Sequence, residues 1–271
     1  MRYYSRKEVE SIGKAGAYSY DDVIDGKSII VSRQLASYWL ATLPDDKGLS
    51  VHFKEDGFWE AWITLWISRN VSPNAVCIDA GANYGYFTFQ LAAHGCEVYA
   101  IEANPALIPF LLKSVELNGF ADRVHVVNAA VSDTDGKKVR LHITESSGNS
   151  SINTYTHTND LILREVDVET IALSRYSGIT PIDFIKMDIE GAEELAFDGL
   201  GRLLRMNPKC VILLELVYEL YPERAKLFYN KISESCVVSY VDYDGNEQPV
   251  KDYSFIENDT EAFRMFVVRS K

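Results

Sequence analysis

The first sign of chemistry in the sequence is a set of acidic residues, each at the end of a short apolar run. The set consists of Asp79, Glu102, Asp188 and Glu215. A short apolar run bounded by turn residues is typical of a buried strand, and ligands of a parallel sheet bind beyond the carboxyl ends of its strands. We therefore expect the four carboxylates to lie along one edge of a sheet and to mark a ligand site.

A glycine loop begins at the first acid and reads Asp79-Ala80-Gly81-Ala82-Asn83-Tyr84-Gly85. A dinucleotide-binding loop has glycine where this loop has Asn83, and a P-loop ends in Gly-Lys-Ser/Thr, so the sequence matches neither motif. Glu102 stands about 20 residues further on, where an acid can accept both hydroxyls of a ribose. The pattern predicts a ligand with a ribose and without a diphosphate, which fits S-adenosylmethionine. A plain strand–turn–helix corner is the structural alternative.

The elements that must position these residues alternate between strand and helix from residue 76 onward. Apolar runs predict strands at 76–78, 97–101, 124–127, 139–143, 165–171, 182–187, 210–214, 237–243 and 263–269. Helices are expected after the glycine loop, from Pro105 to Gly119, from near Glu190 and over 222–233. The alternation predicts an α/β fold with a mainly parallel sheet, helices on both faces, and an antiparallel element formed by the last two strands.

Residues 1–75 lack this alternation. They are rich in aromatic side chains and irregular, except for large apolar residues at helical spacing between Phe58 and Ile67, before a break at Pro73. We expect residues 1–75 to form a helical and irregular extension, and residues 76–271 to form the domain that binds the cofactor.

The overall charge limits the classes of ligand. The chain has 27 Lys and Arg against 39 Asp and Glu, a net charge of −12, which disfavours binding to nucleic acid or to an anionic membrane surface. It has no apolar run of about 18 residues, so no membrane span is expected, and its first residues do not resemble a signal peptide. The four cysteines form no Cys-x-x-Cys pair and suit a reducing cytoplasm.

Several stretches together resemble one family of enzymes. Residues 76–85 are similar to the first motif of class I methyltransferases, and further similarity lies in Ile101-Glu102-Ala103-Asn104-Pro105, Asn128-Ala129-Ala130-Val131-Ser132 and Phe184-Ile185-Lys186-Met187-Asp188-Ile189-Glu190-Gly191-Ala192-Glu193. Over roughly residues 76–270 the chain resembles the FkbM family of S-adenosylmethionine-dependent methyltransferases. The resemblance implies a Rossmann-like class I fold with a seven-stranded, mostly parallel sheet and a C-terminal antiparallel strand. It also implies an O-methyltransferase that acts on a hydroxyl of a carbohydrate or another hydroxylated small molecule.

The resemblance assigns parts of the cofactor to particular residues. Those expected at its methionine end are Asp79, Gly81, Asn83 and Gly85. Glu102 would bind the ribose, Asn128 and Ala129 would lie beside the adenine, and Asp188 would face the sulfonium. The expected cofactor-binding set is completed by Ala82, Ala103 and Asn104. For the first 75 residues the resemblance implies only a lid-like helix, whose candidate contacts to the acceptor are Trp59, Glu60 and Trp62.

An alcohol acceptor needs a base to take its proton as the new bond forms. Asp188 is the first candidate, followed by Glu190 and His157. Acids at a helix start are also favoured by the helix dipole, so a purely structural role stays open for Glu190. Asp188 and Glu215 could together hold Mg²⁺ through oxygen ligands, but two acids are too few for us to assign metal-binding residues.

The residues after the fourth central strand narrow the acceptor. Residues 187–190 contain neither the Asn/Asp-Pro-Pro-Tyr run usual for methylation of nucleobase amino groups nor the cysteine needed for methylation of a base carbon. We therefore expect a small-molecule or glycan acceptor and no nucleic acid. The alternative is a protein that binds an adenosyl ligand on the same fold without catalysis, because a fold does not fix a function. The identity of the acceptor and the oligomeric state do not follow from the sequence.

Overall fold

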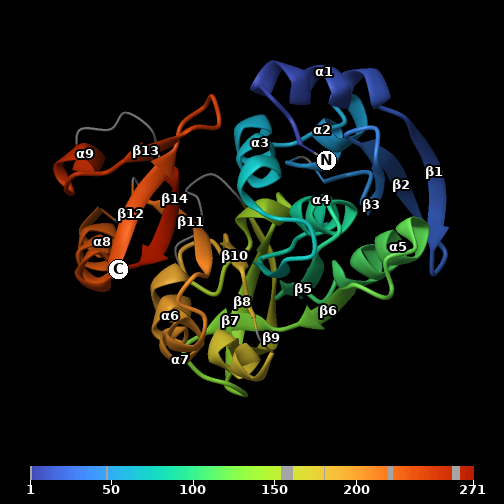
Figure 1. The fold of residues 1–271 in the computed structure, drawn as a ribbon. Helices are drawn as coiled ribbons and strands as arrows, with labels where there is room; N and C mark the ends of the chain where they lie inside the picture. The colour runs from blue at the N-terminus through green and yellow to red at the C-terminus, as the bar shows by residue number, and fades with distance from the viewer. Residues whose placement is uncertain (1, 47, 154–160, 180, 219–221, 258–262) are drawn as a thin grey trace.

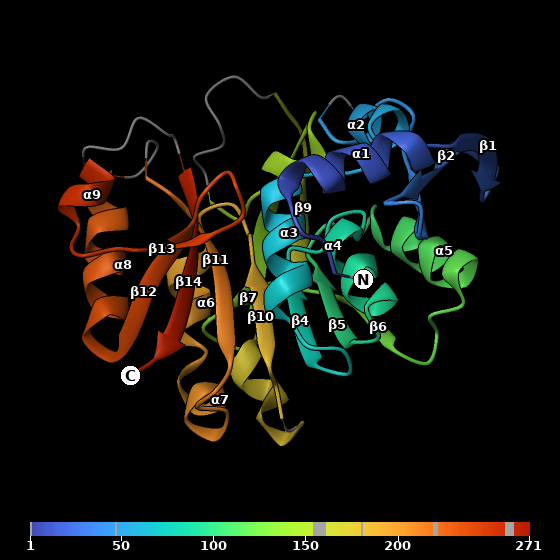
Figure 2. The same cartoon turned by 45° about the horizontal axis from the view of Figure 1, so that its top comes forward.

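The computed structural model describes residues 2–46, 48–153, 161–179, 181–218, 222–257 and 263–271. Its centre is an eight-stranded sheet, drawn in Figures 1 and 2. In sheet order the strands are β13 (Glu247–Pro249), β12 (Cys236–Val241), β14 (Phe263–Ser270), β11 (Val211–Val217), β10 (Phe184–Met187), β4 (Val76–Ala80), β5 (Glu97–Glu102) and β6 (Val124–Asn128).

The strand directions confirm the predicted Rossmann-like architecture. From β11 to β6 all neighbouring strands pair in parallel, whereas β14 runs antiparallel to both β11 and β12. The order changes direction at β4, whose neighbours β5 and β10 lie on opposite sides of it. The sheet differs from the expected seven strands by the short β13, which pairs with β12 after an Asp242–Gly245 turn.

Alternating strand residues divide the apolar core between the two faces of the sheet. Cys77 and Leu213 belong to the core on one face, and Ile78 and Leu214 to the core on the other. The first face carries helices α3 (Ala61–Asn70), α4 (Tyr86–Ala93) and α5 (Ile108–Asn118), and the second carries α6 (Glu193–Asp198), α7 (Gly201–Met206) and α8 (Pro222–Ser235). This alternation is the period-2 pattern of strands buried on both sides.

A second sheet extends from the carboxyl end of β6. It consists of β7 (Ala130–Ser132), β9 (Ile162–Ala172) and β8 (Lys138–Thr144), and β8 and β9 pair antiparallel. The sequence predicted strands at the positions of β8 and β9 but not their pairing. The remaining short elements are two 3₁₀ turns, η1 (Ser147–Asn149) and η2 (Leu173–Gly178), and helix α9 (Ser254–Glu257). The candidate base His157 lies outside the described residues. No helix in the described ranges is both long and apolar enough to cross a membrane.

The N-terminal extension is more ordered than the sequence analysis expected. It contains α1 (Arg6–Gly16), an antiparallel sheet of β1 (Ser19–Ile24), β2 (Lys27–Gln34) and β3 (Tyr38–Thr42), and α2 (Ser50–Glu55), drawn in blue in Figure 1. The description of residues 1–75 as helical and irregular was therefore wrong about this sheet. The expected helix is α3, but it begins at Ala61, so Phe58 and Trp59 precede it.

The extension is fastened to the central domain through the free edge of β3. Ser114 Oγ of α5 accepts the Ala41 N–H at 2.9 Å, and Asn118 Oδ1 accepts the Trp39 N–H at 2.8 Å. These side chains satisfy strand groups that would otherwise stay unpaired at a sheet edge. Leu40 is fully buried in the same apolar core as residues of α4 and α5, so the extension and the sheet domain share one core.

Because of this shared core, we expect Leu40→Ala to destabilise the whole protein. Truncating a buried leucine costs about 2–5 kcal/mol in free energy of unfolding. Urea unfolding should show a single transition at lower urea, while Val23→Ala, at a half-exposed position of β1, should change it by less than about 0.5 kcal/mol. A Leu40→Ala protein with an unchanged main transition would show instead that the extension folds independently.

Candidate active site

A cavity of about 320 Å³ opens at the carboxyl ends of β4, β5, β10 and β11. This is the expected position, where the strand order changes direction. The predicted cofactor or catalytic residues that line it are Gly81, Ala82, Asn83, Glu102, Ala103, Ala129, Asp188 and Glu190. The predicted residues that lie outside its lining are Asp79, Gly85, Asn104 and Asn128.

Gly81 lets two loops of the site come together. It has φ +80°, and a Cβ built on it would lie 1.8 Å from the backbone oxygen of Asp188. On the other side, the Asp188 N–H donates to Ala80 O at 3.1 Å. Any residue larger than glycine would push the glycine loop away from Asp188. Gly85 has a different task, because a Cβ there would collide with Phe89 and Leu111 in the core.

Glu102 is buried at the cavity wall with its carboxyl oriented by backbone donors. Its Oε2 accepts the Asn83 N–H and its Oε1 accepts the Asn104 N–H, both at 2.7 Å. Burial raises the pKa of Glu102 to about 7, against the effect of these hydrogen bonds, which lower it. Each oxygen keeps a lone pair for a further donor, as two ribose hydroxyls would require.

The predicted residues outside the lining support those that line the cavity. Asn128 Nδ2 donates to the backbone oxygen of Glu102 at 2.8 Å, which fixes the end of β5 beside β6. Asn104 Oδ1 accepts the Ala106 N–H at 3.0 Å in the turn that follows Glu102. Asp79 is buried and accepts the Thr88 hydroxyl at 2.6 Å. These contacts stabilise the backbone around the cavity without lining the cavity themselves.

Lys186 is the residue that the sequence analysis left without a role. It lies fully buried in β10, with Nζ 3.0 Å from Asp188 Oδ2 and 4.9 Å from the ring centre of Phe87. Burial lowers the pKa of Lys186, but the carboxylates of Asp188 and Asp79 outweigh burial and raise it above its ordinary value. The signal in the sequence was a lysine inside an apolar strand, because a buried lysine needs a negative partner.

The loop after β10 gives its two acids, Glu190 and Glu193, different roles. Glu190 and Gly191 both have positive φ, 55° and 90°, and form a tight turn. Glu193 is buried, and its Oε1 accepts the N–H groups of Ile189 and Gly191 at 3.0 and 3.2 Å. This carboxyl therefore holds the loop, and the turn directs Glu190 to the cavity.

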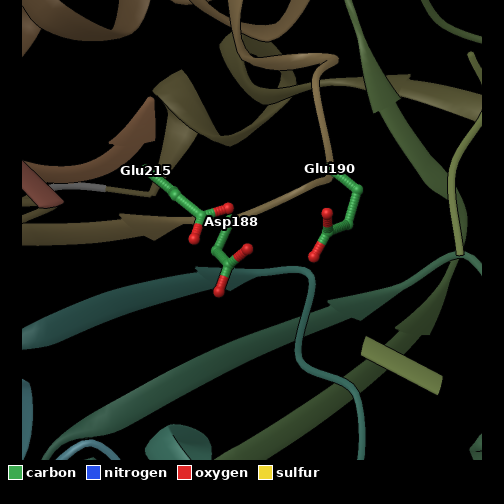
Figure 3. Close-up of side chains that lie close together, drawn as sticks. All are labelled: Asp188, Glu190 and Glu215. Atoms are coloured by element: carbon green, nitrogen blue, oxygen red, sulfur yellow. The ribbon is translucent and has the colours of Figure 1, made fainter. Parts of the chain in front are cut away.

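Three carboxyl groups meet at this end of the cavity. Asp188, Glu190 and Glu215 offer oxygens that all lie within 4.8 Å of one another, and Figure 3 shows the groups pointing toward each other. Burial and the charges of the neighbouring acids raise the pKa of Glu215 well above its ordinary value. Of the described residues that line the cavity, Lys186 is the only basic one, so this end is short of positive charge.

Two segments of the chain cover the cavity. The extension contributes Gly48, Leu49, Phe53, Trp59 and Glu60, whereas Trp62 lies away from the cavity against Tyr243, with ring centres 5.1 Å apart. Residues 146–152 form the other cover. Asp46 joins the two, because its Oδ2 accepts the Tyr84 hydroxyl at 3.1 Å and the Ser147 N–H at 3.3 Å. The sequence analysis did not foresee this serine-rich segment as part of the site.

The lining suits a ligand that has an adenosyl group and a positive charge. Apolar surface for a flat base comes from Ile101, Ala129, Val131 and Leu141. The carboxyl of Glu102 can accept hydrogen bonds from the two hydroxyls of a ribose, and the acids around Asp188 can stabilise a cation. S-adenosylmethionine combines all three features, and it supplies a methyl group already activated on a positively charged sulfur.

The sequence itself establishes the family. Residues 79–231, more than half of the chain, match the model of the methyltransferase FkbM domain. The chain therefore belongs to the FkbM family of methyltransferases, and S-adenosylmethionine is its cofactor. No curated protein matches the sequence.

Known structures show distant similarity to this fold. Precorrin-6Y C5,15-methyltransferase from Geobacter metallireducens has 12% identity and a TM-score of 0.44, over 83% of this chain and 92% of that one. A TehB-like methyltransferase from Corynebacterium glutamicum has 14% identity and a TM-score of 0.43, over 78% and 88%. A candidate methyltransferase from Streptococcus mutans, in complex with SAH, has 13% identity and a TM-score of 0.44, over 77% and 96%.

The buried ammonium gives the first prediction for the site. We expect Lys186→Met to cost about 3–5 kcal/mol in free energy of unfolding near neutral pH, because Asp79 and Asp188 lose their cation. Without Lys186 the pKa of Asp79, already raised by burial, rises further. The loss should therefore shrink as the pH falls and Asp79 takes up a proton. Urea unfolding at several pH values measures this.

The matched control is Lys137→Met, which removes an exposed lysine that lies 3.8 Å from Asp133. It should change the free energy of unfolding by at most about 0.5 kcal/mol at any pH. Equal effects of the two substitutions would contradict the role given to Lys186.

Proposed function

We propose that this methyltransferase transfers the methyl group to a hydroxyl of a carbohydrate or another hydroxylated small molecule. The observation that carries the proposal is the composition of the cavity beside Asp188. Carboxylates that can accept hydrogen bonds from hydroxyls line the same cavity as the aromatic side chains of Phe53, Trp59 and Tyr86. Aromatic faces pack against the apolar faces of sugars, and carboxylates bind their hydroxyls.

The residues of the chain have separate tasks in this proposal. Glu102 binds the ribose, and the glycine loop from Gly81 to Asn83 borders the methionine end of the cofactor. Asp188 accepts a hydrogen bond from the acceptor hydroxyl and orients it. The extension, residues 1–75, covers the acceptor and excludes water, although it is built into the core of the domain at 76–271. In-line transfer depends chiefly on such alignment, since the cofactor carries the activation.

Features of the cavity and of the sequence also support proposals about the acceptor and the cellular location. The size of the cavity supports a small molecule or the end of a glycan as the acceptor, and the net charge of −12 disfavours nucleic acid. We also propose a cytoplasmic location, supported by four cysteines that are all free thiols.

Cofactor binding should depend on pH through Glu102. Only the ionised carboxyl accepts both ribose hydroxyls, so the affinity for S-adenosylhomocysteine should increase as the pH rises through about 7, the pKa of Glu102. Glu102→Gln should weaken binding by at least about tenfold at pH 8, because hydrogen bonds to charged groups contribute about 1.5–3 kcal/mol each. Isothermal titration calorimetry from pH 6 to 8 measures both effects.

The control for this prediction is Glu97→Gln, which changes a partly exposed acid at the other end of the same strand, where it pairs with His125. It should leave the affinity and its pH dependence unchanged. Unaltered binding in Glu102→Gln would remove Glu102 from the site.

The reaction itself is tested with S-adenosylmethionine labelled in its methyl group and with fractions of cellular carbohydrates and hydroxylated metabolites. Mass spectrometry should detect S-adenosylhomocysteine together with a methyl ether. Asp188→Asn should bind the cofactor and lower turnover roughly 10²-fold through misalignment of the acceptor. Tight cofactor binding without methylation in any fraction would favour the alternative, a non-catalytic adenosyl-binding protein. Methylation of nitrogen or carbon would also overturn the proposal.

A further inference from the structure

Glu60 is the acid that the extension places in the cavity. It stands directly before α3 in the left-handed region, with φ 38° and ψ 65°. Its backbone oxygen accepts the N–H groups of Ile63 and Thr64, both at 2.9 Å, so the first turn of the helix fixes it in place. Non-glycine residues rarely adopt this conformation, and those that do concentrate at functional sites.

The same conformation recurs around the cavity. Of the seven described non-glycine residues with positive φ, three line it, namely Glu60, Asn83 and Glu190. They belong to three different segments of the site: the extension, the glycine loop after β4 and the loop after β10. The strained backbone therefore brings polar side chains from three segments to one place.

The carboxyl of Glu60 interacts with its neighbours through charge. Among the residues that the structure describes, none forms a hydrogen bond or an ion pair with it. The charged and titratable groups that face it are Lys186, Asp188, Glu190, Glu215 and Tyr86. Burial, together with the negative charge of Asp188, raises the pKa of Glu60 to about 8, against the opposing charge of Lys186.

Two other acids at this end, Asp188 and Glu215, are less suited to take up a proton. Asp188 is bound to Lys186 at 3.0 Å, and protonating it would leave the buried ammonium without its nearest partner. Burial and the neighbouring acids raise the pKa of Glu215 well above its ordinary value, which disfavours the ionised form that a base needs. An efficient base has a pKa near the working pH and a free oxygen in the cavity.

We propose that Glu60, supplied by the N-terminal extension, accepts the proton of the acceptor hydroxyl, while Asp188 only orients that hydroxyl. This inference rests on the proposed function. It makes Glu60 the base in place of Asp188, the first candidate from the sequence. The acceptor oxygen forms a bond to the methyl carbon as the carbon–sulfur bond breaks, and the electron pair of that bond stays on sulfur. The hydroxyl proton passes to a carboxylate oxygen of Glu60, which then returns it to water.

Turnover of the acceptor fractions gives the first test. Glu60→Gln should keep the affinity for S-adenosylhomocysteine within about threefold and lower turnover by roughly 10²–10⁴-fold. The kcat/KM of the wild type for the acceptor should rise with pH as Glu60 ionises, at a pH below the pKa of about 8 that Glu60 has in the protein without cofactor, because the positive sulfur favours its ionised form. This rise should be absent in Glu60→Gln. Asp188→Asn should keep the rise at a lower overall rate. Glu55→Gln, at an exposed position of α2, is the matched control and should resemble the wild type.

A second test needs no acceptor. The positively charged sulfur of S-adenosylmethionine favours ionised Glu60, whereas S-adenosylhomocysteine has a neutral sulfur. Calorimetry at pH 7 in buffers of different ionisation enthalpy should therefore show more protons released by S-adenosylmethionine than by S-adenosylhomocysteine. The excess should shrink in Glu60→Gln and persist in Glu55→Gln.

The outcomes separate this inference from the proposed function. Turnover of Glu60→Gln within about threefold of the wild type, or an unchanged proton excess, would overturn the role of Glu60. A pH profile that flattens in Asp188→Asn instead would assign the proton to Asp188. A wild type that methylates no hydroxyl would refute the proposed function, even if its proton excess depended on Glu60.

Discussion

One buried ammonium group makes the acidic end of the cavity possible. Lys186 in β10 contacts Asp188 directly and interacts electrostatically with Asp79 and Glu60. These three acids come from three separate parts of the chain. Without this cation the carboxylates would repel one another and take up protons. The ammonium of Lys186 reduces the repulsion between these acids, but a single positive charge balances their negative charge only in part. The positive sulfur of S-adenosylmethionine would supply the kind of charge that this end of the cavity lacks, which is the basis for placing the methionine end of the cofactor there in our proposal.

The extension makes the site complete rather than merely covering it. Its sheet is anchored by α5 side chains at the edge of β3, and its apolar residues share the core of the first face of the central sheet. This anchoring fixes the start of α3 and so positions Trp59 and Glu60 in the cavity wall. A rigid attachment of this kind suits a group that must be aligned with a reacting atom, because small displacements are costly in transfer reactions.

The central sheet and the acids at the ends of its strands could be predicted from the sequence, because buried parallel strands give continuous apolar runs and the acids follow those runs directly. The extension could not be predicted in the same way. Its first strand is mostly polar and exposed, although Asp25-Gly26 is a strong hairpin signal and Ser5 with Glu8 caps α1. Contacts between distant segments explain the other differences between the predicted and the observed residue roles. Gly81 allows the backbone of Asp188 to come close, and Asn128 donates to the backbone oxygen of Glu102 from outside the cavity. Neither is visible in local spacing.

The charge of Lys186 is the most direct test of this account. Nitrogen-15 NMR of the lysine side chains, with the Lys186 signal assigned by its loss in Lys186→Met, reports whether Nζ is an ammonium or a neutral amine. The account predicts an ammonium from about pH 6 to at least about pH 10, because the neighbouring carboxylates outweigh burial. A neutral amine near pH 7 would contradict it, since burial alone would then govern the site.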